Sequence, residues 1–111
     1  MKDLIFATFN TLTKINKMNR ETRFESGLIV YKGDWAGAQW TVTGNMKRSF
    51  TVREFESAYD FEEFIKARLN CRGIEFDSEF CQFFAYTETK ERALKFARDI
   101  EAYFAQVRRL L

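Results

Sequence analysis

The sequence predicts a small α+β domain, built from an antiparallel β-meander of three to four strands with helices packed on one face. Its length of 111 residues is typical of one domain, and 46% hydrophobic residues, including 13 Phe, are enough for an apolar core. Two segments repeat apolar residues at helical spacing, whereas the middle of the chain is rich in β-branched and aromatic residues. We therefore expect residues 1–111 to form a single domain.

The C-terminal helix is expected from Ala93 to the end of the chain. Thr87 or Thr89 can cap its first turn, and acids at its start and arginines at its end suit the helix dipole. Its apolar residues fall in a stripe roughly 140° wide. That stripe contains Phe96, Ala97, Ile100, Tyr103, Phe104, Val107, Leu110 and Leu111.

A second helix is expected over 58–71. Ser57 or Asp60 can cap it, and Gly73 follows as a natural stop. Its apolar residues share one face, which we expect to cover the sheet. They are Phe61, Phe64, Ile65 and Leu69.

Three strands are expected in the middle of the chain, over 27–31, 38–43 and 48–55. The second and third would form a hairpin with the three-residue loop 44–46, because that register keeps apolar side chains on one face. It sets Trp40 opposite Phe50 and Ala38 opposite Val52. The other face would then be polar and solvated, with Gln39, Thr41, Thr43, Ser49, Thr51 and Arg53.

Two further segments complete the predicted order α-β-β-β-α-β-α. Residues 79–86 read as a strand buried on both faces. In residues 3–18 the spacing of the apolar residues favours a helix, while several threonines favour a strand, and we predict a helix. The helix-like spacing is that of Ile5, Phe9, Leu12 and Ile15.

The two cysteines, Cys71 and Cys81, do not fit a disulfide scaffold or a metal site. Such a scaffold carries more cysteines, and a zinc site needs histidines or further thiols, while this sequence has no His. We expect both to be reduced, buried core residues of a cytoplasmic protein. No segment has the apolar length of a signal peptide or of a membrane span.

Catalytic patterns are missing from the sequence. Without His there is no Ser-His-Asp or Cys-His arrangement, and no glycine-rich phosphate loop is present. Glu62 and Glu63 are adjacent, but neighbouring helical positions point about 100° apart, so they do not form a paired acid and base. We expect no enzyme, no cofactor and no metal.

Charge is unevenly distributed along the chain. Residues 1–53 carry nine Lys and Arg against four Asp and Glu, and residues 54–111 carry nine against twelve. Trp35, in a loop between Gly33 and Gly37, is a candidate anchor for a partner, and its alternative place is against the core edge. With nearby aromatic and basic residues it gives the predicted binding site of Tyr31, Lys32, Trp35, Lys47, Arg48 and Arg53.

The sequence therefore favours a non-enzymatic protein-binding domain, such as a small adaptor or inhibitor of a larger protein or nucleoprotein complex, in the style of phage or mobile-element proteins. The alternative is a nucleic-acid-binding module that uses the basic N-terminal half. A homodimer is a further expectation, because Tyr103 and Leu110 lie at the margin of the C-terminal apolar stripe.

Overall fold

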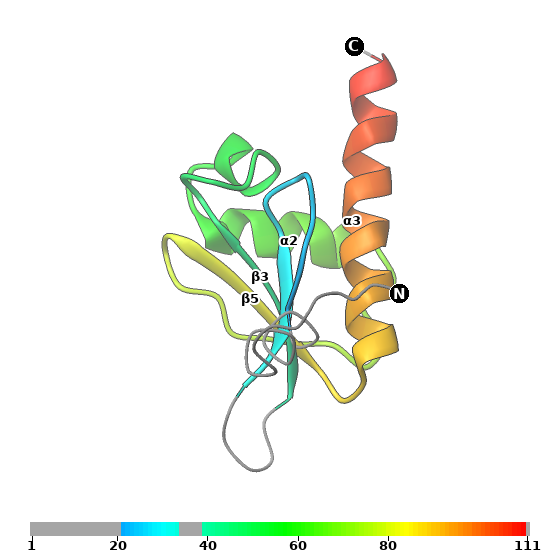
Figure 1. Ribbon diagram of the computed structural model, residues 1–111. Coiled ribbons are helices and arrows are strands. Elements are labelled where there is room, and N and C mark those ends of the chain that lie inside the picture. The colour runs from blue at the N-terminus through cyan, green and yellow to red at the C-terminus, as the bar shows by residue number, and fades with distance from the viewer. Residues whose placement is uncertain (1–20, 34–38, 111) are drawn as a thin grey trace, which may run out of the picture.

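The computed structural model describes residues 21–33 and 39–110, which form a compact α+β domain (Figure 1). Its five-stranded antiparallel sheet has the order β1-β2-β3-β5-β4. The bounds are β1 Glu21–Arg23, β2 Ile29–Lys32, β3 Trp40–Asn45, β4 Glu75–Phe76 and β5 Gln82–Thr87. The predicted helix over 3–18, the Trp35 loop and Ala38 lie outside the described residues.

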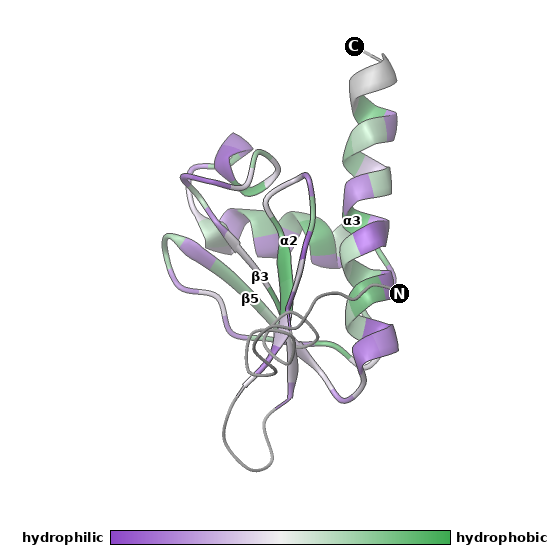
Figure 2. Cartoon of the chain, in the orientation of Figure 1, coloured by the Kyte–Doolittle hydropathy of each residue, from purple (hydrophilic) through white to green (hydrophobic). Residues whose placement is uncertain are grey.

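Both long helices pack against the same face of the sheet, as the sequence predicts. They are α2, Ala58–Arg68, and α3, Lys90–Leu110, whose C-terminal end projects beyond the other elements (Figure 1). The hydropathy of α3 alternates around the helix, as expected for a helix with one covered side (Figure 2). The core joins sheet residues Val30, Val42, Phe83 and Ala85 to Phe61 and Ile65 of α2 and Phe96, Ala97 and Ile100 of α3.

Local signals fix where the helices begin. The Ser57 hydroxyl accepts a hydrogen bond from the Asp60 N–H at 3.1 Å, and Thr89 plays the same part for the Arg92 N–H at 3.1 Å. Each bond satisfies a backbone donor that has no partner inside its helix. The predicted cap Ser57 is thus confirmed, and of the two candidates before α3 it is Thr89 that caps the helix.

The partner of β3 differs from the prediction. Instead of a hairpin with residues 48–55, β3 pairs with β2 and with β5, which sets Val42 opposite Val30 and Ala85. The expected pairing of Trp40 with Phe50 is therefore wrong, and Trp40 lies opposite Thr87. Pairing with β5 is favoured because the alternating apolar residues of β5 extend the buried face.

Residues 48–55 form turns and a short 3-10 helix, η1 Val52–Glu54, instead of the predicted strand. The hydroxyls of Ser49 and Thr51 are 2.9 Å apart, and the Arg53 N–H bonds to the Ser49 carbonyl at 3.0 Å. Such local bonds replace a strand ladder. Val52 is fully buried, and a Cβ on Gly44 would approach the Val52 side chain to 2.9 Å. The segment therefore closes one end of the core.

The segment predicted as a strand over 79–86 is a strand only from Gln82. Its two faces are unequal instead of both buried, because Phe83, Ala85 and Thr87 are buried while Gln82, Phe84 and Tyr86 on the other face are half-buried. Phe80 and Cys81, which precede the strand, are exposed. Glu79 and Gln82 form an isolated bridge, so Phe80 and Cys81 occupy the tip of a tight turn. The sequence missed the two-residue strand β4 and the edge strand β1.

The face of the sheet away from the helices is less solvated than predicted. Thr41 and Thr43 are only 4% and 6% exposed, and the Thr43 hydroxyl donates to the Phe83 carbonyl at 2.7 Å. Ser49 and Thr51 are buried outside the sheet. Antiparallel partners share a face, so Tyr31 joins Thr41 and Tyr86 on this side.

Both cysteines are free thiols, but neither is buried in the core. Cys71 is half-buried beside the C-terminal end of α2, and partial burial raises the pKa of its thiol. Cys81 is exposed. Among the described residues, the helices are too short or too polar to cross a membrane.

Candidate interaction surface

The predicted binding residues divide between two ends of the sheet. Tyr31 and Lys32 lie at the end of β2, beside the start of β3, whereas Lys47 and Arg48 follow the end of β3. The six residues of β3 separate the two groups by roughly 17 Å. Arg53 is exposed in η1, near the second group, and Trp35 lies outside the described residues.

Lys47 and Arg48 line a pocket of about 350 Å³ at the end of β3. Both side chains are exposed, and in the described part of the chain neither forms an ion pair. These two cations give the pocket a positive field that favours an anionic group. Its other walls are formed by Gly27, Ile29, Thr43, Gly44, Asn45 and Gln82.

A chain of side-chain hydrogen bonds fixes the floor of this pocket. The Asn45 side-chain amide accepts from the Lys47 N–H through its oxygen at 2.8 Å and donates through its nitrogen to the side-chain oxygen Oε1 of Gln82 at 2.9 Å. The Gln82 amide donates in turn to the Thr43 hydroxyl at 2.6 Å. Because the loop is held by groups on β3 and β5, Lys47 and Arg48 leave the sheet from an ordered base.

An exposed aromatic pair lies beside the loop that carries Lys47 and Arg48, which we call the basic loop. Phe80 is 60% exposed and Tyr59 is 51% exposed, and they are the exposed large hydrophobic side chains of the described chain. Their rings meet edge to face with centroids 6.5 Å apart. The Phe80 carbonyl accepts from the Ala58 N–H at 2.8 Å, which fixes the turn against the start of α2.

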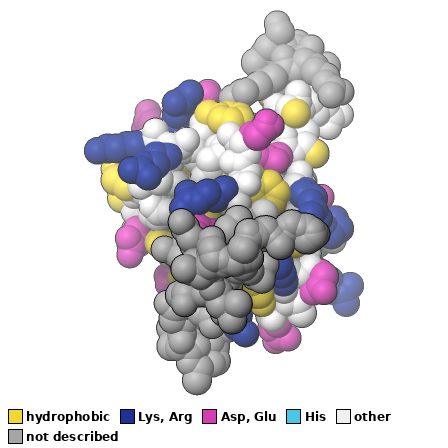
Figure 3. Space-filling model, viewed as in Figure 1, with side chains coloured by type: hydrophobic (Ala, Val, Ile, Leu, Met, Phe, Trp, Pro, Cys, Tyr) yellow, Lys and Arg dark blue, Asp and Glu magenta, His cyan; other side chains and the backbone are white. Residues whose placement is uncertain are grey.

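The aromatic pair and the basic loop belong to one end of the molecule. The Met46 N–H donates to the Cys81 carbonyl at 3.0 Å, so the loop before Lys47 and the turn that carries Phe80 are adjacent. Figure 3 shows basic side chains gathered beside hydrophobic ones at the edge where these turns lie. We call Lys47, Arg48, Tyr59 and Phe80 the end surface.

Sequence reasoning missed the aromatic half of the end surface. For Tyr59 a signal existed, because it lies on the opposite side of α2 from the apolar stripe of Phe61 and Ile65. Phe80 had no such signal, since alternation with Gln82 and Phe84 is also what a buried strand would show. Only the pairing of Glu79 with Gln82 turns it outward.

The face of the sheet away from the helices offers a second, less accessible aromatic group. Phe84 and Tyr86 stack with centroids 6.4 Å apart, and Tyr31 lies in the same row as Tyr86. Burial raises the pKa of the Tyr86 hydroxyl, and the nearby Asp77, Tyr31 and Glu79 act in the same direction. These rings are half-buried, so they present less apolar area than Phe80 does.

The described residues contain no group of three or more His, Cys, Asp or Glu that could hold a metal ion. No protein family, curated protein or solved structure matches the chain. The fold therefore defines the protein as a small α+β domain, and the end surface is its candidate interaction site.

Proposed function

We propose that this chain is a non-enzymatic protein-binding domain, which recognises its partner through the end surface. The observation that carries the proposal is the exposed edge-to-face pair of Tyr59 and Phe80 beside Lys47 and Arg48, which form no ion pair with a described residue. When a partner covers an exposed aromatic ring, apolar surface is removed from water, and this favours binding. Aromatic and Arg side chains also contribute most of the binding free energy in many interfaces. An adaptor or inhibitor role fits such a surface.

The chemistry of the end surface describes the partner. An apolar hollow would cover Phe80 and Tyr59, while carboxylates at its rim would face Lys47 and Arg48. The rings would contribute most of the affinity because they are fully desolvated on binding. The cations, which stay near solvent, would mainly set the association rate.

The test is affinity purification on the immobilised chain from its source cells, after nuclease treatment. We expect a protein to be retained by the wild type and lost with the double variant Tyr59→Ser, Phe80→Ser. Arg48→Glu should reduce the association rate, and the matched exposed arginine change Arg98→Glu should have no effect. Circular dichroism of each variant establishes that its fold is intact.

Nucleic-acid binding is the outcome that would replace this proposal. Retention would then disappear after nuclease treatment, Arg48→Glu would abolish it, and the aromatic variant would be neutral. The logarithm of the affinity for nucleic acid would also fall linearly with the logarithm of salt concentration, since released counterions drive that binding.

A further inference from the structure

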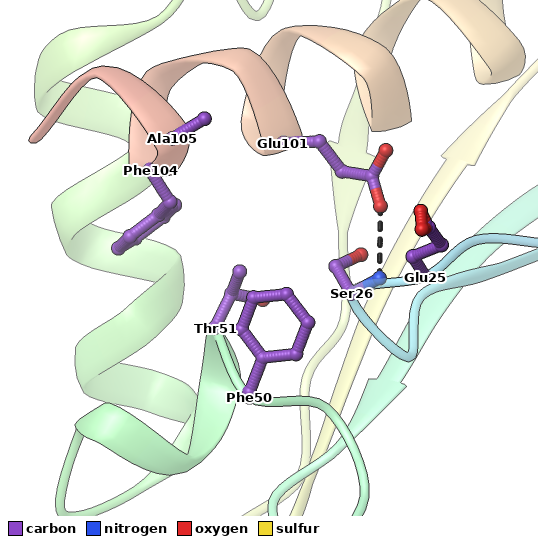
Figure 4. A pocket seen from close by; sticks show the side chains of 7 residues that line it. All are labelled: Glu25, Ser26, Phe50, Thr51, Glu101, Phe104 and Ala105. Atoms are coloured by element: carbon purple, nitrogen blue, oxygen red, sulfur yellow. Dashed lines mark hydrogen bonds between the residues drawn. The ribbon is translucent and has the colours of Figure 1, made fainter. Parts of the chain in front are cut away.

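A second pocket, of about 360 Å³, opens between the turn after β1, the segment after β3 and the C-terminal half of α3. Figure 4 shows Glu101 and Ala105 on α3, with Phe50 and Thr51 across from them and Glu25 and Ser26 on a third side. Pockets for small ligands begin at about 300 Å³. This pocket is close to that lower limit, so it can hold a single long side chain.

The walls of the pocket are largely apolar and fixed by the core. The Phe104 ring stacks on Phe61 at 6.0 Å between centroids and meets the Phe55 ring edge to face at 6.3 Å. The Phe50 N–H donates to the Ser26 carbonyl at 3.0 Å, which ties the opposite wall to the turn after β1. The pocket therefore exists before any ligand binds.

Two carboxylates give this apolar pocket a negative charge. Glu101 Oε2 accepts from the buried Ser26 N–H at 2.9 Å, across 75 residues of sequence (Figure 4). That bond holds the carboxylate in place and leaves its Oε1 able to accept. Glu25 also lines the pocket, and neither acid forms an ion pair with a described residue.

We propose that this pocket binds the side chain of an arginine from a partner protein. A guanidinium group is planar, so it can lie against an aromatic ring while its forked N–H groups reach carboxylate oxygens. An apolar side chain would leave the two carboxylates without a counter-charge, and a lysine ammonium lacks the planar surface. The origin of the arginine in a protein rests on the proposed function, whereas the guanidinium specificity does not.

The opposite charge of the two pockets supports this assignment. Gly27 lines the basic pocket with Lys47 and Arg48, while the neighbouring Glu25 and Ser26 line the acidic one. One turn therefore separates a site for an anionic group from a site for a cationic group. A partner that carries both charges can be oriented by them, because each pocket repels the other's ligand.

The test is an NMR titration of the full chain with Nα-acetyl-arginine N-methylamide. We expect saturable shifts of the Ser26, Thr51 and Ala105 amide signals, and binding at least about tenfold tighter than that of the neutral citrulline analogue. The lysine analogue should bind more weakly than the arginine analogue. Because no partner is present, failure here leaves the end-surface proposal unaffected.

Variants locate the site. Glu101→Gln keeps an acceptor for the Ser26 N–H but removes the charge, and Ala105→Met fills the pocket from an exposed helical position; each should weaken binding at least about fivefold. Glu25→Gln removes the second carboxylate charge at an exposed residue and should also weaken binding of the arginine analogue. The control Glu91→Gln, at an exposed residue outside the pocket, should leave the affinity unchanged. Equal binding of the citrulline or lysine analogue, no saturable shift, or insensitivity to all three pocket variants would overturn the proposal. So would markedly tighter binding of free arginine, which would point to the amino acid instead of a protein side chain.

Discussion

The Ala58 N–H donates to the Phe80 carbonyl at 2.8 Å, which joins the first residue of α2 to the tip of the turn before β5. This bond satisfies one of the donors that every helix start leaves without an internal partner. It also holds the Phe80 backbone while its ring stays 60% exposed. The conformation of the turn is therefore set by the backbone, and the Phe80 ring is available to a partner.

Phe80→Ala should leave the fold almost unchanged. Because its ring is mostly exposed, we expect the free energy of unfolding to fall by less than about 1 kcal/mol in urea titrations. The matched change Phe83→Ala, three residues later and fully buried, should cost about 3–5 kcal/mol. A loss above about 2 kcal/mol for Phe80→Ala would show that the ring supports the core.

Gly27→Ala should be strongly destabilising. Gly27 has φ +91°, and a Cβ there would lie 2.6 Å from the Ser49 Cα and 2.7 Å from the Arg48 carbonyl oxygen. Backbone strain of this kind costs about 1–3 kcal/mol, and the clash with two backbone atoms adds to it. Thermal unfolding would measure the loss.

Gly73→Ala is the control for that change. Gly73 also has a positive φ, of +78°, but a Cβ there meets nothing within 4 Å. Its substitution should therefore cost only about 1 kcal/mol, from the backbone conformation alone. Equal losses for the two glycines would contradict the close approach of Gly27 to residues 48–49.

Phe104→Ala tests the aromatic cluster under the projecting end of α3. Phe104 contacts the rings of Phe55, Phe61 and Phe64 at 5.7–6.3 Å between centroids, but it is only partly buried. We expect a loss of about 2–3 kcal/mol, less than for the fully buried Phe61. A loss below about 1 kcal/mol would show that the cluster contributes little.

The cysteines should react in a fixed order with N-ethylmaleimide. Cys81 is exposed, whereas Cys71 is half-buried and its pKa is raised by that burial, so less thiolate is present at Cys71 near neutral pH. Peptide mass spectrometry should find Cys81 modified first, and Cys71 modification should accelerate as pH rises. Because both thiols are free, reductant should leave the melting temperature unchanged.

Trp35→Ala tests the hypothesis that the sequence supplies for the loop between Gly33 and Gly37. If Trp35 is a partner anchor, the variant loses binding and keeps its melting temperature, because no core contact is removed. A lower melting temperature would place Trp35 against the core edge.

Self-association, expected from the apolar stripe of α3, is checked by the mass from light scattering at high concentration.

The sequence by itself determined the fold class and the two helices. Each helix starts where a hydroxyl accepts a hydrogen bond from the backbone N–H three residues later in the chain, as the hydroxyls of Ser57 and Thr89 do. Their covered faces follow from a spacing of three and four residues. These contacts are local, so the segment itself carries the information.

Tertiary structure decided the pairing of the strands and the location of both candidate sites. Residues 48–55 alternate like a strand and are the expected partner of β3. The observed partner is β5, about 40 residues further along the chain, because Phe83 and Ala85 complete the core face. That pairing makes Phe80 a turn residue and brings Gln82 to Thr43. The hydrogen bond between Glu101 and Ser26 joins residues that are 75 positions apart in the chain. A sequence pattern cannot reveal it, because two such distant residues meet only when the intervening chain has folded.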